Sequence, residues 1–230
     1  MDLGKIIRFE NEDFIVVDKP AGWLSVAGRD SRSHCLLHHL SQWRKCQFWP
    51  IHRLDQPVGG LILYGKNRGA HRIANQWFEN RSIRKVYEAL SDGHDFPAPG
   101  SRFKWQHTLL RGKKRAYERP FGKLAETEGV FTGVRQVGER NLGVWTLHPK
   151  TGRAHQLRFQ LSKAGFPIWG DRLYGSCHEF ENQCIALRAV ELDFSRVKGA
   201  RLGLPQELRV EGIWEWITLA PKQAVNYSQN

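Results

Sequence analysis

Short β-type segments are spread along the whole chain, and they limit its fold more than any other feature of the sequence. Each is a short apolar run, carries β-branched residues or alternates polar and apolar side chains. The pattern predicts strands at residues 8–19, 60–64, 84–90, 129–137, 142–147, 186–194 and 207–219. Residues 138–141 are expected to form the hairpin connection between two of them.

Three segments between the strands favour helices. Ser33 is the expected N-cap of a helix that ends near Arg44. Apolar residues at helical spacing predict an amphipathic helix over residues 70–78, and residues 155–164 predict another that ends at Gly165. No repeat and no low-complexity linker divides the chain. The sequence therefore predicts an α+β fold with mostly antiparallel strands, in a single domain over residues 1–230.

The chain is strongly basic, with 35 Lys and Arg residues against 23 acidic ones and a formal net charge of +12. This balance favours a polyanionic partner, although a basic surface can also serve solubility alone. No apolar stretch approaches the length of a membrane span, and the N-terminus lacks the apolar core of a secretory signal. We therefore expect a cytoplasmic protein with no membrane contact.

Four cysteines occur in 230 residues, and none forms a C-x-x-C pair. Such a low content predicts reduced thiols rather than a disulfide framework. Cys35, His38, His39 and Cys46 could be drawn as a zinc site. However, Leu36, Leu37, Leu40 and Trp43 recur at helical spacing through the same segment, which favours an ordinary helix, and we expect no metal.

Residues 102–123 hold eight basic residues and a single acid, Glu118, with aromatic side chains interleaved. Alternating cations and aromatics suit a surface that follows a nucleic-acid backbone and stacks on bases. The alternative is a solvated hairpin whose aromatic residues belong to the core. We predict that Lys113, Lys114 and Arg115 bind RNA phosphates.

The sharpest motif is H-R-L-D-Q-P-V-G-G-L at residues 52–61. It places a carboxylate, Asp55, in a Pro/Gly-rich turn just before a strand, and loops of this kind often carry function. By itself, an Arg-x-Asp turn is more often a local ion pair. Three further motifs accompany it, in the order V-V-D-K-P-A-G (16–22), R-K-V-Y-E-A-L (84–90) and T-G-R-A-H-Q-L-R (151–158), the last running on to G-F-P-I-W-G-D-R-L-Y-G (165–175).

In that order the motifs resemble the RluA-like family of RNA pseudouridine synthases, over about residues 7–219. The resemblance implies a pseudouridine synthase fold, a mixed and mostly antiparallel sheet split by a central cleft with flanking helices. It also implies isomerisation of uridine to pseudouridine in RNA without cofactor or metal. Consistent with this, the sequence has no Walker A motif and no dinucleotide fingerprint.

The resemblance implies a catalytic role for Asp55, Tyr87 and Arg158. Asp55 would be the nucleophile, attacking ribose C1′ or uracil C6 or assisting a glycal route, and an ion pair with Arg158 would favour its charged form. Tyr87 would stack on the extruded uracil and assist removal of its C5 proton. The target must be flipped out to reach Asp55, and Arg53 is the candidate to enter the vacated stack.

Three motif residues beside these, His52, Arg153 and His155, are also predicted to bind RNA. The first strand begins near residue 8, so we expect no separate N-terminal RNA-binding domain of the S4 type. Recognition would then fall to the catalytic domain itself, as a monomer. The segment L-S-V-A-G-R at residues 24–29 looks most like short RluA-type members, which implies 23S rRNA and/or tRNA as the substrate.

One departure from the family pattern stands beside the nucleophile. The usual Asp-x-x-Thr-Ser-Gly is replaced by Asp55-Gln56-Pro57-Val58-Gly59-Gly60, which lacks two hydroxyls. This leaves open a catalytically impaired RNA-binding or RNA-folding protein on the same fold. A glycosidase is disfavoured because no second carboxylate is well placed, since strand alternation directs Glu88 away from Tyr87.

Overall fold

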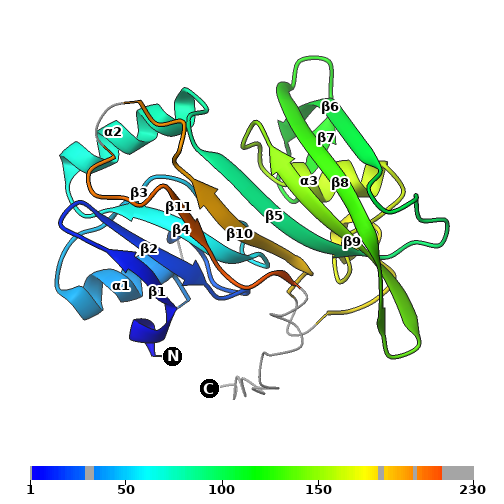
Figure 1. Ribbon diagram of the computed structural model, residues 1–230, viewed down its shortest axis with the longest axis horizontal. Helices are drawn as coiled ribbons and strands as arrows, with labels where there is room; N and C mark the ends of the chain where they lie inside the picture. Colours follow the sequence, from blue (N-terminus) through cyan, green and yellow to red (C-terminus); the bar gives the residue numbers. More distant parts are fainter. Residues whose placement is uncertain (1, 29–33, 181–183, 199–200, 214–230) are drawn as a thin grey trace.

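One large sheet runs through the computed structural model, which describes residues 2–28, 34–180, 184–198 and 201–213 (Figure 1). Its strands are β1 (Ile7–Glu10), β2 (Phe14–Lys19), β3 (Trp49–Pro50), β4 (Gly59–Gly65), β5 (Arg84–Ser91), β6 (Arg102–Arg111), β7 (Ala116–Glu118), β8 (Lys123–Val137), β9 (Arg140–Pro149), β10 (Leu187–Asp193) and β11 (Glu207–Arg209).

The main strand order is β1-β2-β4-β10-β5-β9-β8-β6-β7, with β3 beside β4 and β11 beside β10. Within the described ranges, the pairing of β4 with β10 is parallel and the other strand pairs are antiparallel. The predicted α+β fold is confirmed. Strand β5 crosses the middle of the molecule between the two halves of the sheet, so residues from both halves can meet beside it (Figure 1).

Within the described ranges, three α-helices cover the sheet: α1 (Leu36–Arg44), α2 (Arg68–Glu79) and α3 (Gln156–Lys163). The predicted amphipathic helix over residues 70–78 is confirmed as α2, which buries Ala70, Ala74 and Trp77. These side chains pack with Phe14 and Val16 of β2. Strand β2 therefore has one face beneath α2.

The other face of β2 carries Ile15 and Val17, which belong to a second core with Leu36 and Leu40 of α1 and with apolar residues of α3. Strands β2 and β4 are buried along their whole length because helices cover both faces. This explains why their sequences are continuous apolar runs rather than alternating patterns.

The single strand predicted over residues 8–19 is wrong, because the structure forms the hairpin β1–β2 there. The Asn11 side chain accepts hydrogen bonds from the backbone N–H groups of Asp13 and Phe14 (2.9 and 2.8 Å). Such Asx turns compete with extended backbone and reverse the chain.

Helix boundaries differ from prediction at α1 and agree at α3. Ser33 lies outside the described residues, and α1 begins at Leu36 with Cys35 as its N-cap. Helix α3 ends at Lys163, and Gly165 follows with φ +88°. The N–H groups of Gly165 and Phe166 donate to Ser162 and Leu161 (3.0 and 2.9 Å), as in a Schellman motif, which accounts for glycine at this position.

The late strand predicted over residues 207–219 is also too long. Strand β11 ends at Arg209, and residues 214–219 lie outside the described part of the chain. Beyond it, Arg188 donates to the Glu211 carbonyl (2.9 Å) and the Ile213 N–H donates to the Glu88 carboxylate (2.9 Å). Side chains thus take the backbone hydrogen bonds that a longer strand would have used.

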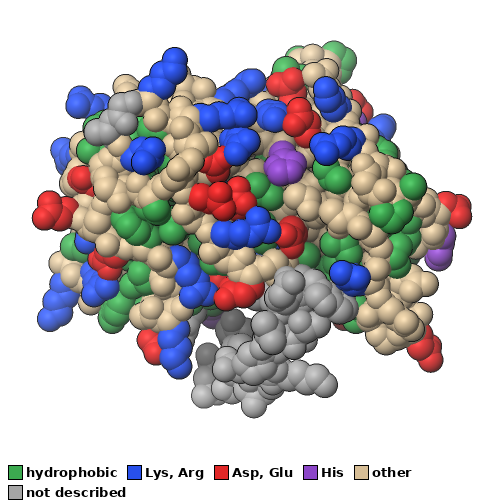
Figure 2. Space-filling model, viewed as in Figure 1, with side chains coloured by type: hydrophobic (Ala, Val, Ile, Leu, Met, Phe, Trp, Pro, Cys, Tyr) green, Lys and Arg blue, Asp and Glu red, His purple; other side chains and the backbone are tan. Residues whose placement is uncertain are grey.

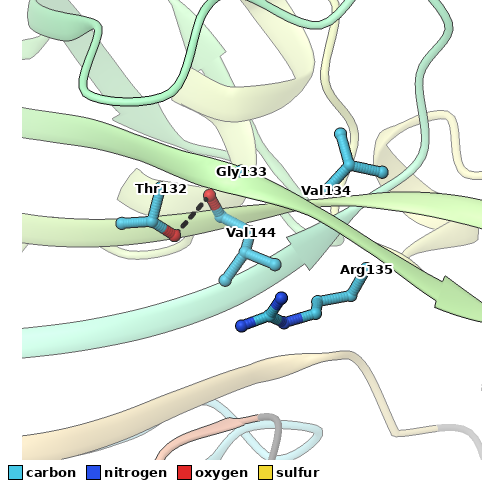
Figure 3. Close-up of a pocket in the computed structure, with 5 residues that line it drawn as sticks. All are labelled: Thr132, Gly133, Val134, Arg135 and Val144. Carbon is cyan, nitrogen blue, oxygen red and sulfur yellow. Dashed lines mark hydrogen bonds between the residues drawn. The ribbon is translucent and has the colours of Figure 1, made fainter.

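The predicted β8–β9 hairpin is confirmed, with its turn at residues 138–139 and β8 beginning earlier than expected, at Lys123. A register shift between Phe131 and Gly133 marks a bulge in β8. Beside it, the Thr132 hydroxyl donates to the Val144 carbonyl (3.1 Å) in a small hollow that Figure 3 shows.

The aromatic residues of the basic segment divide into two groups. Phe103 and Trp105, on β6, pack against Trp145 with ring centroids 5.4 and 5.9 Å away and join the core. Tyr117 and Phe121 instead remain 37 and 74% exposed. The core interpretation therefore holds for the first pair alone.

The alternative zinc site is not supported by the geometry of α1. Cys35 precedes this nine-residue helix and Cys46 follows it, so roughly 13 Å of helix separates them. Within the described ranges, we also find no helix that is long and apolar enough to cross a membrane.

Candidate active site

Asp55 lies in the loop between β3 and β4, which is anchored from the core. The neighbouring Leu54 is buried, and its N–H and carbonyl both bond to the Ser25 hydroxyl (3.0 and 2.8 Å). Tyr64 of β4 holds Ser25 in turn, because its hydroxyl donates to the Ser25 carbonyl (2.8 Å). The Asp55 side chain itself is 31% exposed. A rigid base thus presents one carboxylate to solvent.

A buried amine braces the same loop. Lys19, at the end of β2, is completely buried, and its Nζ donates to the carbonyls of Pro20, Trp23 and Gln56 (3.0, 2.7 and 3.2 Å). Burial lowers the pKa of Lys19 to about 7, although the charges of nearby groups, Asp55 among them, oppose the shift. Lys19 therefore links the backbone of Gln56, the residue after Asp55, to the turn that follows β2.

Arg158 of α3 points at Asp55 from the other half of the sheet. Its Nη1 lies 3.5 Å from Asp55 Oδ2. A second carboxylate, Asp171, holds the same guanidinium more tightly, through Nε–Oδ2 and Nη2–Oδ1 bonds of 2.7 and 2.8 Å. Because this pair is bidentate, it fixes the plane of the guanidinium and leaves Nη1 for Asp55.

Arg158 keeps its positive charge although it is buried, with 5% of its surface exposed. Burial alone would lower the pKa of Arg158, but the hydrogen bonds and charge of Asp171, together with the charge of Asp55, raise it above its ordinary value. The site therefore holds a buried cation that contacts both Asp171 and Asp55.

His155 and Tyr174 complete the wall around Asp55. His155 Nε2 lies 3.9 Å from Asp55 Oδ2, and its Nδ1 lies 3.1 Å from the Tyr174 hydroxyl. Burial lowers the pKa of His155, so the imidazole is neutral at pH 7. Burial also raises the pKa of Tyr174 to about 12. The Arg158 guanidinium lies over the Tyr174 ring, 5.1 Å from its centroid.

Tyr87 reaches the site from β5. Its partners in the sheet are Leu147 on β9 and Ala189 on β10, so it sits at the centre of the sheet. Burial, and next the charge of Asp55, raises the pKa of Tyr87 well above its ordinary range. The phenol therefore stays protonated and lies within electrostatic reach of the carboxylate.

Comparison with known proteins is consistent across most of the chain. Residues 13–163 match the profile of the family described as RNA pseudouridylate synthase. A protein of Vibrio vulnificus named dual-specificity RNA pseudouridine synthase RluA is 31% identical over 84% of this chain and 78% of its own length. The chain belongs to the RluA-like RNA pseudouridine synthases.

A relative in Bacillus subtilis, named uncharacterized RNA pseudouridine synthase YhcT, is 29% identical over 77% of this chain; the match spans 60% of that relative's length. Among solved structures, human RNA pseudouridylate synthase domain containing 1 aligns with a TM-score of 0.70. It is 22% identical and covers 93% of each chain, and it supports the pseudouridine synthase fold.

The structure brings the three predicted catalytic residues together, from the β3–β4 loop, β5 and α3. His155 joins them. Arg53 is exposed beside the site, and within the described ranges it makes no hydrogen bond or ion pair. Arg153 lies on the same loop as His155, where its Nε donates to the Leu124 carbonyl (2.9 Å).

His52 has the contacts of a structural residue rather than of an RNA ligand. Its ring stacks on Phe78 of α2 with centroids 4.8 Å apart, and its Nε2 accepts the Leu63 N–H (3.0 Å). Burial, and then the charge of Lys85, lowers the pKa of His52 to about 3. A neutral histidine held in this way supports the loop before Asp55, and its assignment to RNA binding stays a prediction.

Sequence reasoning missed Asp171, Tyr174, Lys19 and Ser25 as parts of the site. Asp171 and Tyr174 stand in G-D-R-L-Y-G, and Lys19 in V-V-D-K-P-A-G, so the motifs contained them without indicating their partners. Ser25 offered no signal, because a lone serine after a turn is common in any loop.

This loop is held without the two hydroxyls that the family pattern has and this chain lacks. Val58 is buried in the core, and Gly60 has φ +113° with the Ala189 backbone where a Cβ would stand. At Gly59 a Cβ would make ordinary contacts, 3.4 Å from the Lys19 carbonyl and 3.5 Å from Arg188. Lys19, Ser25 and the packing of Val58 brace the loop instead.

The back of β5 carries a different kind of surface. Glu88, whose side chain leaves the face of β5 opposite to Tyr87, lines a broad hollow with Arg209 and Glu211. Acidic and basic side chains interleave over β10 and β11 in Figure 2, and Arg209 pairs with Glu88 and Glu191 (3.4 and 2.9 Å). The positive charge of Arg209 is thus offset by acidic neighbours in this hollow.

Proposed function

We propose that this protein converts uridine to pseudouridine in structured RNA, with Asp55 as the nucleophile. The proposal depends on one observation: the Asp55 carboxylate lies between the two halves of the sheet with Arg158 and His155 beside it. A partly exposed carboxylate near a fixed guanidinium can stay ionised and attack an electrophilic carbon. The ribose C1′, uracil C6 and glycal routes all use this ionised form.

Tyr87 and Arg53 have separate roles in this proposal. Tyr87 stacks on the flipped uracil, and its protonated phenol favours that role over removal of the C5 proton. The exposed Arg53 fills the gap that the flipped nucleotide leaves, because a planar guanidinium can substitute for a base in the stack. Arg153 contributes a cation to the RNA backbone beside them.

The proposed substrates are 23S rRNA and/or tRNA, and the name of the Vibrio relative, which includes dual specificity, supports more than one RNA. Turnover tests the function directly. Purified protein incubated with unmodified total RNA is expected to create pseudouridine at a few discrete positions, detected by chemical mapping. Tight RNA binding without any new pseudouridine would instead favour the catalytically impaired RNA-binding protein.

A monomeric state, the absence of a metal and a cytoplasmic location stay predictions.

Lys113, Lys114 and Arg115 are proposed to contact phosphates. All three are exposed in the turn between β6 and β7. Replacing them together by glutamine is expected to flatten the dependence of log Kd on log salt by about two units, because each lost phosphate contact removes roughly 0.7–0.9. Binding titrations between low and moderate salt measure this slope.

A variant with Lys45, Arg68 and Arg72 replaced by glutamine is the matched control, since these cations are equally exposed but lie on or beside α1 and α2. Its slope is expected to equal that of the wild type. Equal slopes for both triple variants would remove the β6–β7 turn from the RNA interface.

A further inference from the structure

Four of the seven strongly exposed large hydrophobic side chains in the described part of the chain lie within residues 110–124. They are Leu110, Tyr117, Phe121 and Leu124, exposed by 41, 37, 74 and 43%, and we call them the hairpin patch. Leu110 is paired with Tyr117 and Thr108 with Leu124, so strand alternation directs the three strand residues to one face. Exposed apolar groups that gather in this way mark interaction sites.

Exposed cations stand in the two turns that flank Tyr117. They are Lys113, Lys114 and Arg115 between β6 and β7, and Arg119 between β7 and β8. The guanidinium groups of Arg115 and Arg119 lie 5.0 and 5.8 Å from the Tyr117 ring centroid. The one acid of the segment, Glu118, already pairs with Lys163 of α3 (3.6 Å). This charge favours a polyanion over an apolar protein surface.

A chain of contacts links the hairpin patch to the active site. The N–H of Ala116, next to Tyr117, donates to the Tyr174 hydroxyl (2.7 Å). That hydroxyl lies 3.1 Å from His155, which in turn faces Asp55. RNA that places a uridine at Asp55 therefore runs close to β7, which ends the main strand order of the sheet and whose Tyr117 faces outward on the side opposite to Ala116.

We propose that the hairpin patch is a stacking platform for an unpaired base near the target uridine in the RNA. Aromatic rings beside arginines suit this task, because every base has a π-face and its phosphate is anionic. Phe121 is the residue best placed to stack on a base, because its ring is 74% exposed. The aromatic residues Phe103 and Trp105 of the same segment instead pack against the core. The proposal rests on the proposed function, since it requires RNA at the active site, and it specifies a substrate with unpaired nucleotides beside the target.

Binding of two single-stranded RNAs of roughly 12 nucleotides tests the platform. One is oligouridylate and the other an abasic oligomer of equal length and charge. The variant Tyr117→Leu/Phe121→Leu, which keeps apolar bulk but removes both rings, is expected to bind oligouridylate roughly tenfold more weakly. Its affinity for the abasic oligomer is expected to stay within about twofold of the wild type, since the phosphate contacts remain.

Three further variants sharpen the result. Phe121→Leu alone changes a ring with little packing, so folding is not at risk, and it should give part of the loss. Tyr117→Phe keeps the ring and should bind normally. Trp43→Leu is the matched control, because Trp43 is also exposed (42%) beneath an arginine, Arg44, but lies on α1.

Unchanged affinity of the double variant for oligouridylate would overturn the proposal and direct attention to a protein partner for the hairpin patch. An equal loss on both oligomers would overturn it too, because the effect would then come from displaced cations. Pseudouridine formation by the wild type, measured separately, tells whether the enzymatic function stands when the platform fails.

Discussion

Asp55→Asn is expected to reduce pseudouridine formation below detection. Asparagine has the size of aspartate and can still accept a hydrogen bond from Arg158, which lies 3.5 Å from the carboxylate. The neutral amide cannot attack carbon, so the covalent or charge-assisted step is lost while the loop keeps its shape. Pseudouridine in a defined RNA is quantified after single-turnover incubation.

RNA affinity should stay within a few fold of the wild type, because the base and backbone contacts lie elsewhere. Asp13→Asn is the matched control: Asp13 is a half-buried aspartate between β1 and β2 that accepts a hydrogen bond from Asn67 (2.7 Å). It should retain full turnover. Normal turnover by Asp55→Asn would refute the assignment of the nucleophile.

Asp171→Asn is expected to cause the largest combined loss of stability and activity. Asp171 is 1% exposed and makes both short hydrogen bonds to Arg158. The substitution leaves a buried cation with one carboxylate 3.5 Å away, which costs about 3–5 kcal/mol of the free energy of unfolding. Denaturant unfolding of the two proteins measures this difference.

The released guanidinium is then free to close on Asp55 and restrain the nucleophile. A displacement of about 1 Å at a catalytic group can cost on the order of 100-fold in rate, so kcat should fall by at least that much in conditions where the variant is folded. The RNA Kd should change far less, because Arg158 is buried and offers little surface to RNA.

Asp193→Asn separates positioning from stability. Asp193 is another buried aspartate, and it pairs with Arg84 through Nε (2.6 Å) at the edge of β5 and β10. This variant should lose stability but keep its kcat where it is folded. Equal losses of kcat in both variants would show that Asp171 acts through general stability and not by holding Arg158.

Local patterns were sufficient for much of the fold. The period of apolar residues predicted α2, because an amphipathic helix buries one face and its own sequence records that face. The wrong prediction of one strand over residues 8–19 also has a local cause, because the Asn11 side chain forms a turn that makes this segment a hairpin.

The ordered motifs also determined the family and the neighbourhood of the site. They named Asp55, Tyr87 and Arg158 as one constellation although 103 residues separate the first from the last. No periodicity carries that information, since it rests on the resemblance of four motifs in their order.

Only the tertiary structure decided which partner each charge meets. Sequence analysis paired Arg158 with Asp55, whereas the tighter partner is Asp171, which is 13 residues away and brought back by the turn after α3. Likewise, alternation along residues 102–123 could not show that Trp105 enters the core while Phe121 faces solvent. The physical reason is the same in both cases: a pattern defines two faces of an element, and the packing of distant elements determines which face is covered and which charges are desolvated together.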